Sequence, residues 1–316
     1  MVISGAKMNV IEAKNLVKKY KNTLAVAGVS FTVETGEILG VLGPNGVGKT
    51  TLLSLVSTLF KPDQGEIYFK GENIVQKPKA IRPYLGFVPQ DIALYETLRV
   101  KDNLYFWGGI YGVKHSEIKN RMCEVLEIVG LNLQMNHSVG NLSGGMKRRL
   151  NIAAALMHKP QILIMDEPTV GIDTESREYI TSALKNLKRE GMSVIYTSHY
   201  IDEAEFLCDK IMVMNKGKAS VWGTIDELRN MVGLKDKIRI RVNPDINEEK
   251  LKKIPFMVQN NAQCIDGVLE IPADQGKTEI IEVLKSLEAS AIKLDEVYIE
   301  KPGLERIYLE LLKKEA

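Results

Sequence analysis

The chain has 316 residues, enough for one large domain and a smaller one. Hydrophobic residues make up 45% and charged residues 26%, which argues against disorder, and a net charge of +2 gives no reason to expect nucleic acid or an anionic membrane as the main partner. The chain has no signal-peptide pattern, no apolar run near the roughly 20 residues of a membrane span, and no metal or disulfide spacing among its three cysteines. We expect a soluble protein of the reducing cytoplasm.

Short β-rich runs fill residues 10–42. "VSFTV" alternates, so that Val29, Phe31 and Val33 share one face of a predicted strand. "ILGVLG" is apolar throughout, as a strand buried on both faces should be. The segment after the following glycine-rich loop, "TTLLSLVSTLF", has apolar residues at helical spacing, namely Leu52, Leu53, Val56 and Leu59.

Strands and helices alternate through most of the remaining chain. "GEIYFKG" and "YLGFVPQ" predict strands, and residues 91–141 change to amphipathic helices with the aromatic run "LYFWGGIYG". The strand–loop–helix pattern then returns with "ILIMDEP", a helix over 174–190, "SVIYTSH", a short helix from 201 and "KIMVMNKGK". This order predicts an α/β fold with a mostly parallel sheet covered on both sides.

A different pattern begins near residue 230. "KIRIRV" alternates, and a short helix, the strands "FMVQ" and "GVLEI", a helix over 276–288, the strand "AIKLDEVYI" and the helix "LERIYLELLKK" follow. The pattern predicts a compact α+β domain of about 80 residues, near the small end of independent domains.

The string "GPNGVGKT" at 43–50 matches G-x-x-x-x-G-K-[ST] between an apolar strand and a helix, the context that supports a phosphate-binding loop. Gly43, Gly46 and Gly48 let backbone N–H groups curl around phosphate oxygens. Lys49 supplies positive charge to the β- and γ-phosphates, and the Thr50 hydroxyl is placed to bind Mg²⁺. A plain glycine-rich turn would not need the lysine and threonine in register.

"ILIMDEP" supplies the acidic half of such a site. Asp166 follows a buried strand and can hold Mg²⁺ through water. Side chains alternate along a strand, so Glu167 cannot face the same way and is free to act as general base toward the attacking water. Two acids after a strand could also merely cap a helix, and the phosphate-binding loop makes that alternative improbable.

The roles of three further residues are ambiguous when each residue is considered alone. Gln90 and His199 end predicted strands, where open α/β sheets place their ligands. Tyr20 could stack on a base. Each could equally be structural, and only their order and spacing favour a functional role.

The string "NLSGGMKRRL" at 141–150 is a second anion-binding pattern without a lysine to complete it. Ser143 can cap a helix, and Gly144 and Gly145 leave backbone N–H groups uncovered. The basic residues that follow have the wrong charge for a helix N-terminus, and a solvated basic face is a real alternative for Arg148 and Arg149. We interpret the Ser-Gly-Gly segment as half of a site whose ATP is held by another subunit.

In order, Tyr20, "GPNGVGKT", Gln90, "LSGGM", "ILIMDEP", "GID" and His199 resemble the motifs of ATP-binding subunits of ABC transporters over roughly residues 8–230. "LSGGM", the aromatic run and the tail "PGLERIYLELL" resemble the branch that exports drugs, antibiotics or sodium. The resemblance implies a P-loop NTPase fold for 8–230, with a RecA-like core, an N-terminal antiparallel β subdomain and a helical subdomain over about 91–157. For 231–316 it implies a ferredoxin-like accessory domain.

The resemblance also implies ATP and Mg²⁺ as cofactors, a head-to-tail dimer (a homodimer or a paired ABC ATPase) closed by ATP, and an integral membrane permease that holds the subunit at the inner face of the membrane. The implied nucleotide-binding residues are Tyr20, Gly43, Pro44, Asn45, Gly46, Val47, Gly48, Lys49, Thr50 and Thr51, with Ser143, Gly144 and Gly145 reaching the partner's ATP. The implied Mg²⁺ residues are Thr50, Gln90 and Asp166, the catalytic residues are Glu167, His199 and Gln90, and Asp173 lies at the dimer interface.

The motifs depart from the family pattern at two places: Met146 replaces a glutamine, and Thr174 follows Asp173 where proline is frequent. Neither change removes a catalytic group. Some of the aromatic residues in the helical subdomain should form an exposed patch that receives a permease helix.

Two other functions are alternatives to transport. A soluble ABC ATPase acting on nucleic acid or ribosomes is disfavoured by the near-neutral charge, by the single cassette and by the lack of long heptad runs, so no nucleic-acid partner is expected. A GTP-binding switch would need Asn-Lys-x-Asp, and the nearest string, "NKGK" at 215–218, lacks the aspartate.

Overall fold

The computed structural model describes residues 8–242, 262–265, 267–273, 277–290 and 294–314. The chain divides into two compact units, Met1–Ile225 and Asp226–Ala316. The domain limits expected from the sequence, 8–230 and 231–316, stay predictions.

The first unit contains a six-stranded sheet in the order β10-β9-β3-β8-β7-β6. Its strands are β3 (Ile38–Leu42), β6 (Leu85–Val88), β7 (Ile162–Met165), β8 (Ser193–Ser198), β9 (Lys210–Asn215) and β10 (Lys218–Gly223). All pairings are parallel except that of β9 with β10. The predicted mostly parallel sheet is confirmed, and the carboxyl ends of its parallel strands meet at one edge.

This sheet is buried on both faces, because successive residues of one strand enter different hydrophobic cores. In β7, Leu163 packs among the helices, whereas Ile164 packs toward the antiparallel sheet and α1 (Lys49–Val56). In β8, Tyr196 likewise packs among the helices and Ile195 packs toward the antiparallel sheet. These strands are therefore continuous apolar runs rather than alternating ones.

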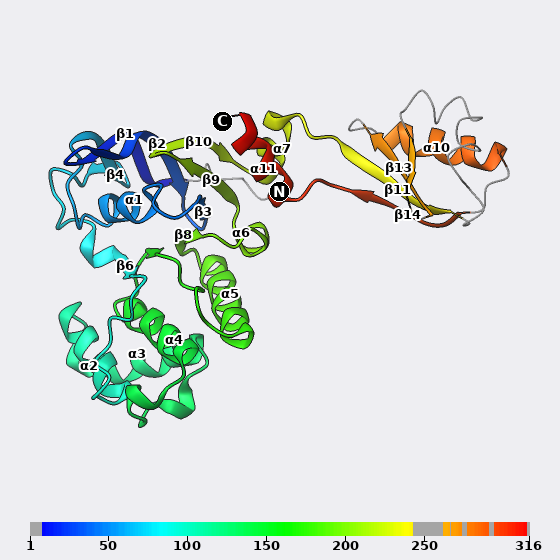
Figure 1. The fold of residues 1–316 in the computed structure, drawn as a ribbon. Helices are drawn as coiled ribbons and strands as arrows, with labels where there is room; N and C mark the ends of the chain where they lie inside the picture. Colours follow the sequence, from blue (N-terminus) through cyan, green and yellow to red (C-terminus); the bar gives the residue numbers. More distant parts are fainter. Residues whose placement is uncertain (1–7, 243–261, 266, 274–276, 291–293, 315–316) are drawn as a thin grey trace, which may run out of the picture. The chain divides into compact units, whose positions relative to one another are not determined.

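An antiparallel sheet in the order β2-β1-β4-β5 forms a second layer (Figure 1). Its strands are β1 (Asn9–Tyr20), β2 (Thr23–Glu34), β4 (Gln64–Phe69) and β5 (Glu72–Asn73). Val29, Phe31 and Val33 are buried together, as predicted. The prediction for Leu59 was wrong: α1 ends at Val56, so Leu59 lies beyond the helix and is 58% exposed.

Helices α2 (Val100–Ile110), α3 (His115–Ile128) and α4 (Gly144–Leu156) pack together beside the sheets (Figure 1). Helices α5 (Thr174–Arg189) and α6 (Ile201–Leu207) follow β7 and β8, and short 3-10 turns occupy Arg82–Tyr84, Asn132–Gln134 and Val139–Asn141. Among the described residues no helix combines the length and apolar character that a bilayer crossing requires.

The second unit has an antiparallel sheet in the order β12-β13-β11-β14. Its elements are α7 (Ile225–Val232), β11 (Asp236–Val242), β12 (Gln263–Ile265), β13 (Val268–Ala273), α10 (Lys277–Ala289), β14 (Leu294–Glu300) and α11 (Leu304–Lys314). Ile238, Ile240 and Leu269 form its core with Val283 and Leu287 of α10. The expected "FMVQ" strand and the short helix before it lie outside the described residues, and the ferredoxin-like type stays a prediction.

Candidate functional site

The loop between β3 and α1 can be built only with glycine at two points. Gly43 and Gly48 have φ values of 156° and 106°. A Cβ on Gly48 would lie 2.0 Å from the carbonyl oxygen of Ala25, and one on Gly43 would lie 2.5 Å from that of Met214. The loop therefore passes too close to β2 and β9 at these two points for any side chain, and glycine also permits the positive φ values.

Three predicted residues meet at the base of this loop. Lys49 is 5% exposed, and its Nζ lies 3.2 Å from Glu167 Oε1. The other carboxylate oxygen of Glu167 lies 3.5 Å from His199 Nδ1. Lys49 Nζ also donates to the carbonyl oxygens of Gly43 (2.8 Å) and Pro44 (3.2 Å). The structure thus joins the lysine, the glutamate and the histidine.

Asp166 and Glu167 direct their carboxylates to different partners. Asp166 Oδ1 accepts a hydrogen bond from Thr197 Oγ1 (2.8 Å), and the same hydroxyl oxygen accepts from the backbone N–H of Glu167 (2.8 Å). The divergence was predicted, but its physical cause differs. β7 ends at Met165, and the chain turns because Glu167 has a φ of 45°, in the left-handed region.

A cavity of about 580 Å³ opens over this loop. The predicted residues that line it are Asn45, Gly46, Val47, Gly48, Lys49, Thr50, Thr51, Gln90 and Glu167. The predicted residues Gly43, Pro44, Asp166 and His199 do not line it but contact residues that do or directly adjoin them. The carboxyl ends of β3, β6 and β7 therefore bring the loop, the glutamine and the glutamate to one hollow.

Tyr20 is not part of the cavity lining. It ends β1, is 42% exposed, and its ring meets that of Phe60 edge-on at 6.4 Å between centroids. Its partner in the β1–β2 register is Thr23, which does line the cavity. A base-stacking role for Tyr20 stays a prediction.

The Ser-Gly-Gly segment forms a separate group, which does not line the cavity. Ser143 caps α4, and its Oγ accepts a hydrogen bond from the N–H of Met146 (3.2 Å). A Cβ on Gly145 would lie 2.4 Å from Asp173 Oδ2, so this segment and Asp173 are immediate neighbours. Asp173 caps α5, and the backbone N–H of Ser176 stabilises its charged form and lowers its pKa.

A solvated basic face for Arg148 and Arg149 is wrong, because the two side chains are 3% and 4% exposed. Arg148 Nη1 donates to the carbonyl oxygen of Pro89 (2.6 Å), and its Nη2 donates to that of Glu167 (3.0 Å). Arg149 Nη1 donates to the carbonyl oxygen of Val129 (3.2 Å). Both arginines face inward because carbonyls at loop ends need donors there.

Sequence reasoning missed several residues of the site. Thr197 joins both acidic residues, and its only signal was its place beside Ser198 and His199 at the carboxyl end of a buried strand. The turn between β9 and β10 contributes Lys216 and Gly217 to the cavity, and Gly217 N–H donates to the carbonyl oxygen of Val47 (3.1 Å). The string "NKGK", which does not match the guanine-binding pattern, thus supports the phosphate-binding loop.

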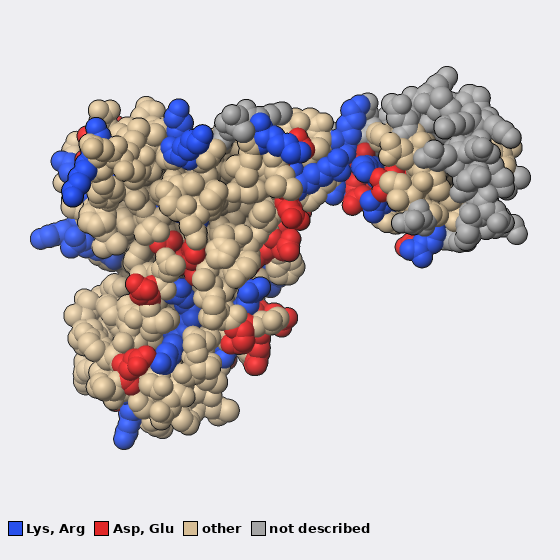
Figure 2. Space-filling model, viewed as in Figure 1, with Lys and Arg blue, Asp and Glu red and all other residues tan. Residues whose placement is uncertain are grey.

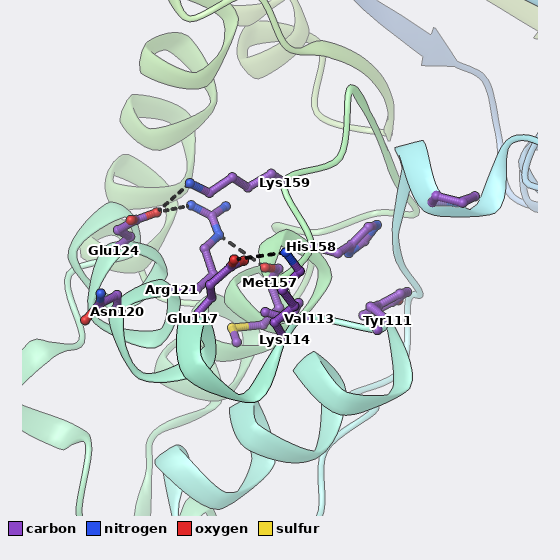
Figure 3. A pocket seen from close by; sticks show the side chains of 12 residues that line it. Tyr111, Val113, Lys114, Glu117, Asn120, Arg121, Glu124, Met157, His158 and Lys159 are labelled. Atoms are coloured by element: carbon purple, nitrogen blue, oxygen red, sulfur yellow. Dashed lines mark hydrogen bonds and ion pairs between the residues drawn. The ribbon is translucent and has the colours of Figure 1, made fainter.

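A second hollow of about 470 Å³ lies among α2, α3 and the end of α4. Figure 3 shows Arg121 and Lys159 converging on Glu124, at 2.6 and 3.5 Å. The Tyr111 ring stacks on His158 with 4.0 Å between centroids, and His158 Nε2 lies 2.9 Å from the carbonyl oxygen of Leu85. The contacts of His158 therefore join the segment after α4 to the end of α2 and to β6.

Burial lowers the pKa of His158 below its ordinary value of about 6.5, so the folded chain resists a proton that the unfolded chain accepts. The stability that the neutral ring contributes is full above about pH 6.5 and is lost as the pH falls through and below that value. We expect the melting temperature to fall less between pH 7.5 and 5.5 in His158→Gln than in the wild type, as measured by circular dichroism. Equal falls in the two proteins would rule out this role of His158.

Comparisons with known proteins agree with this geometry. A family model described as "ABC transporter" matches residues 26–170. The linearmycin resistance ATP-binding protein LnrL of Bacillus subtilis is 42% identical over 95% of this chain and 97% of its own length. The doxorubicin resistance ATP-binding protein DrrA of Mycobacterium tuberculosis is 30% identical over 90% of this chain and 88% of its own. A dimeric ATP-binding cassette in a post-hydrolysis state, bound to ADP and Pi, superimposes with a TM-score of 0.63 at 29% identity, over 68% of this chain and 98% of that one.

Proposed function

This chain belongs to the ATP-binding subunits of ABC transporters, and we propose that two such cassettes close head to tail around ATP to drive a separate membrane permease. The chain is a transport ATPase. Export of a drug, an antibiotic or an ion is supported by near full-length similarity to proteins named for linearmycin and doxorubicin resistance. The permease would hold the chain at the inner face of the membrane.

The observation that carries the nucleotide site is the convergence of Lys49, Gln90 and Glu167 on one cavity. The residues present fit ATP with Mg²⁺. Thr50 lines the cavity with an exposed side chain, and Asp166 is buried with one carboxylate oxygen held by Thr197. Mg²⁺ held by Thr50, Gln90 and Asp166 would neutralise charge on the phosphate oxygens. Asn45–Thr51 would hold the phosphates.

Glu167 is proposed to accept the proton of the attacking water. One of its carboxylate oxygens is 3.2 Å from Lys49 Nζ and the other 3.5 Å from His199 Nδ1, so both oxygens are oriented by cationic or polar neighbours. His199 would hold the γ-phosphate beside the glutamate. Lys49 would place its charge at the β- and γ-phosphates, where it stabilises the negative charge of the transition state.

The half-site interpretation of Ser143, Gly144 and Gly145 is supported by their place outside the cavity, grouped with Asp173. These backbone N–H groups start α4, where a helix N-terminus favours an anion. Dimeric cassettes are among the similar solved structures. We propose that the segment contacts the γ-phosphate of ATP held by a partner subunit.

Lys49→Ala tests the nucleotide site. We expect ATP affinity to fall at least about tenfold, since one charge-assisted contact to phosphate is worth roughly 1.5–3 kcal/mol. Filter binding with radiolabelled ATP measures this effect. Lys216→Ala, at the rim of the same cavity, is the comparison variant and should lose less. Wild-type affinity in Lys49→Ala would refute the assignment of this loop.

The aromatic side chains of α2 and of the loop before it divide into an inward and an outward set. Trp107 packs against the helical core, whereas Tyr95, Tyr105 and Phe106 are 48%, 46% and 37% exposed. Tyr95 and Phe106 meet edge-on at 5.0 Å between ring centroids. We propose that these three rings receive a permease helix.

On the face drawn in Figure 2, basic and acidic side chains are interspersed over the first unit, which suits a protein partner better than a polyanion.

Phe106→Asp tests the aromatic patch. We expect it to abolish co-purification with the co-expressed permease, because a charge placed in an apolar contact must be desolvated. Soluble ATPase activity should stay within about twofold of wild type. A multi-span membrane protein encoded beside this chain is the permease to test. Undiminished co-purification would remove the patch from the interface.

A further inference from the structure

Arg148 connects three parts of the site through two hydrogen bonds. Its guanidinium is almost fully buried and donates from Nη1 to the carbonyl oxygen of Pro89 and from Nη2 to that of Glu167. Pro89 directly precedes Gln90, which lines the cavity. A guanidinium is a rigid planar fork, so the distance between these two carbonyls is held by the geometry of one group.

Glu167 needs such support because its backbone is strained. A non-glycine residue with a φ of 45° keeps that conformation only where its surroundings hold it. Thr197 Oγ1 accepts from the Glu167 N–H at one end, and Arg148 donates to the Glu167 carbonyl at the other. The strained conformation directs the carboxylate to Lys49 and His199.

Arg148 also lies in the first turns of α4, the helix that Ser143 caps and that Gly144 and Gly145 begin. A helix moves as a rigid element over so short a distance. A displacement at the start of α4 therefore reaches the Glu167 carbonyl through a single side chain. Both hydrogen bonds of the guanidinium go to backbone carbonyls, and the carboxylates of Asp166 and Asp91 act on its charge from nearby. Burying this charge costs desolvation free energy that apolar packing would not require.

We propose that Arg148 is a positioning residue that couples engagement of the Ser143–Gly145 half-site to the alignment of Glu167 and Gln90. The proposal rests on the proposed function, because it needs the partner's ATP at the start of α4. Arg148 does not line the cavity. It acts by holding the glutamate in its strained conformation, and it should affect the rate of hydrolysis without affecting nucleotide affinity.

Arg148→Met and Arg148→Lys test the coupling. In Arg148→Met, which fills the space without donors, we expect kcat to fall about tenfold to a hundredfold, the loss typical of a misplaced catalytic group. KM for ATP and ATP-driven dimerisation should stay within about threefold of wild type, because Arg148 lies outside the cavity lining. Arg148→Lys can still donate to at least one carbonyl, so its kcat should lie between those of Arg148→Met and wild type.

Arg149→Met is the matched control. Arg149 is the adjacent residue of α4, is equally buried and donates to the carbonyl of Val129, and its guanidinium stacks on Tyr179 at 4.6 Å. Its loss should lower the melting temperature as much as the loss of Arg148 while kcat stays within about twofold of wild type, since neither Val129 nor Tyr179 lines the cavity.

Wild-type kcat in Arg148→Met, an equal fall of kcat in Arg149→Met, or a kcat in Arg148→Lys no better than in Arg148→Met would each overturn the coupling. If Arg148→Met does not fold, Arg148→Lys decides: a lowered kcat at unchanged KM supports the proposal, and wild-type kcat refutes it. A wild-type chain that neither dimerises in ATP nor hydrolyses it would instead refute the proposed function, before any variant is compared.

Discussion

Glu167→Gln is expected to lower the rate of ATP hydrolysis at least about a hundredfold, the usual contribution of a general base, while ATP binding is retained. The amide has the shape of the carboxylate but cannot accept the proton of the attacking water. It also removes the negative partner 3.2 Å from Lys49 Nζ, so the buried lysine charge is left to be balanced by phosphate alone. Binding should therefore tighten rather than weaken, and the closed dimer should accumulate.

Single-turnover hydrolysis and sedimentation velocity in ATP measure these two effects. Glu37→Gln is the matched control, because Glu37 is also a buried glutamate but lies before the amino end of β3, beside Lys210. It should hydrolyse ATP at nearly the wild-type rate. Hydrolysis at the wild-type rate in Glu167→Gln would exclude this carboxylate as the base.

Ser143→Arg is expected to abolish ATP-driven dimerisation while each monomer binds ATP with wild-type affinity. The side chain lies outside the cavity, so the nucleotide held by the chain's own loop is not touched. A long side chain at the start of α4 would fill the place proposed for the partner's γ-phosphate. The change also removes the cap on the N–H of Met146, which costs helix stability about 1 kcal/mol.

Ser143→Asp separates the two effects, since aspartate is a good cap but places a negative charge against the phosphate. It should keep wild-type thermal stability and still fail to dimerise. Mixing Ser143→Arg with Lys49→Ala should recover some hydrolysis, because one complete site can then form from two defective chains. Full dimer in ATP with Ser143→Arg, seen by sedimentation, would mean that the half-site interpretation is wrong.

The phosphate-binding loop and its acidic partner could be predicted because their chemistry lies in short contiguous strings. A Cβ would lie 2.0 Å from a carbonyl oxygen at Gly48 and 2.5 Å from one at Gly43, so the loop requires glycine at both positions. Both glycines can be read directly in "GPNGVGKT". The strands were predicted for a similar reason. A strand buried on both faces, such as β3, must be apolar at nearly every position.

Only the tertiary structure decided the contacts made by residues far apart in sequence. Arg148 donates to two carbonyls rather than facing water because the fold brings Pro89 and Glu167 next to it. The residues beside Arg148 in the sequence of α4 do not indicate these partners. The same holds for Thr197, and for which rings of the aromatic run are exposed. The sequence by itself determined the chemistry of the groups, since residue types set it. Their partners were decided by packing, because burial and hydrogen bonding depend on the whole fold.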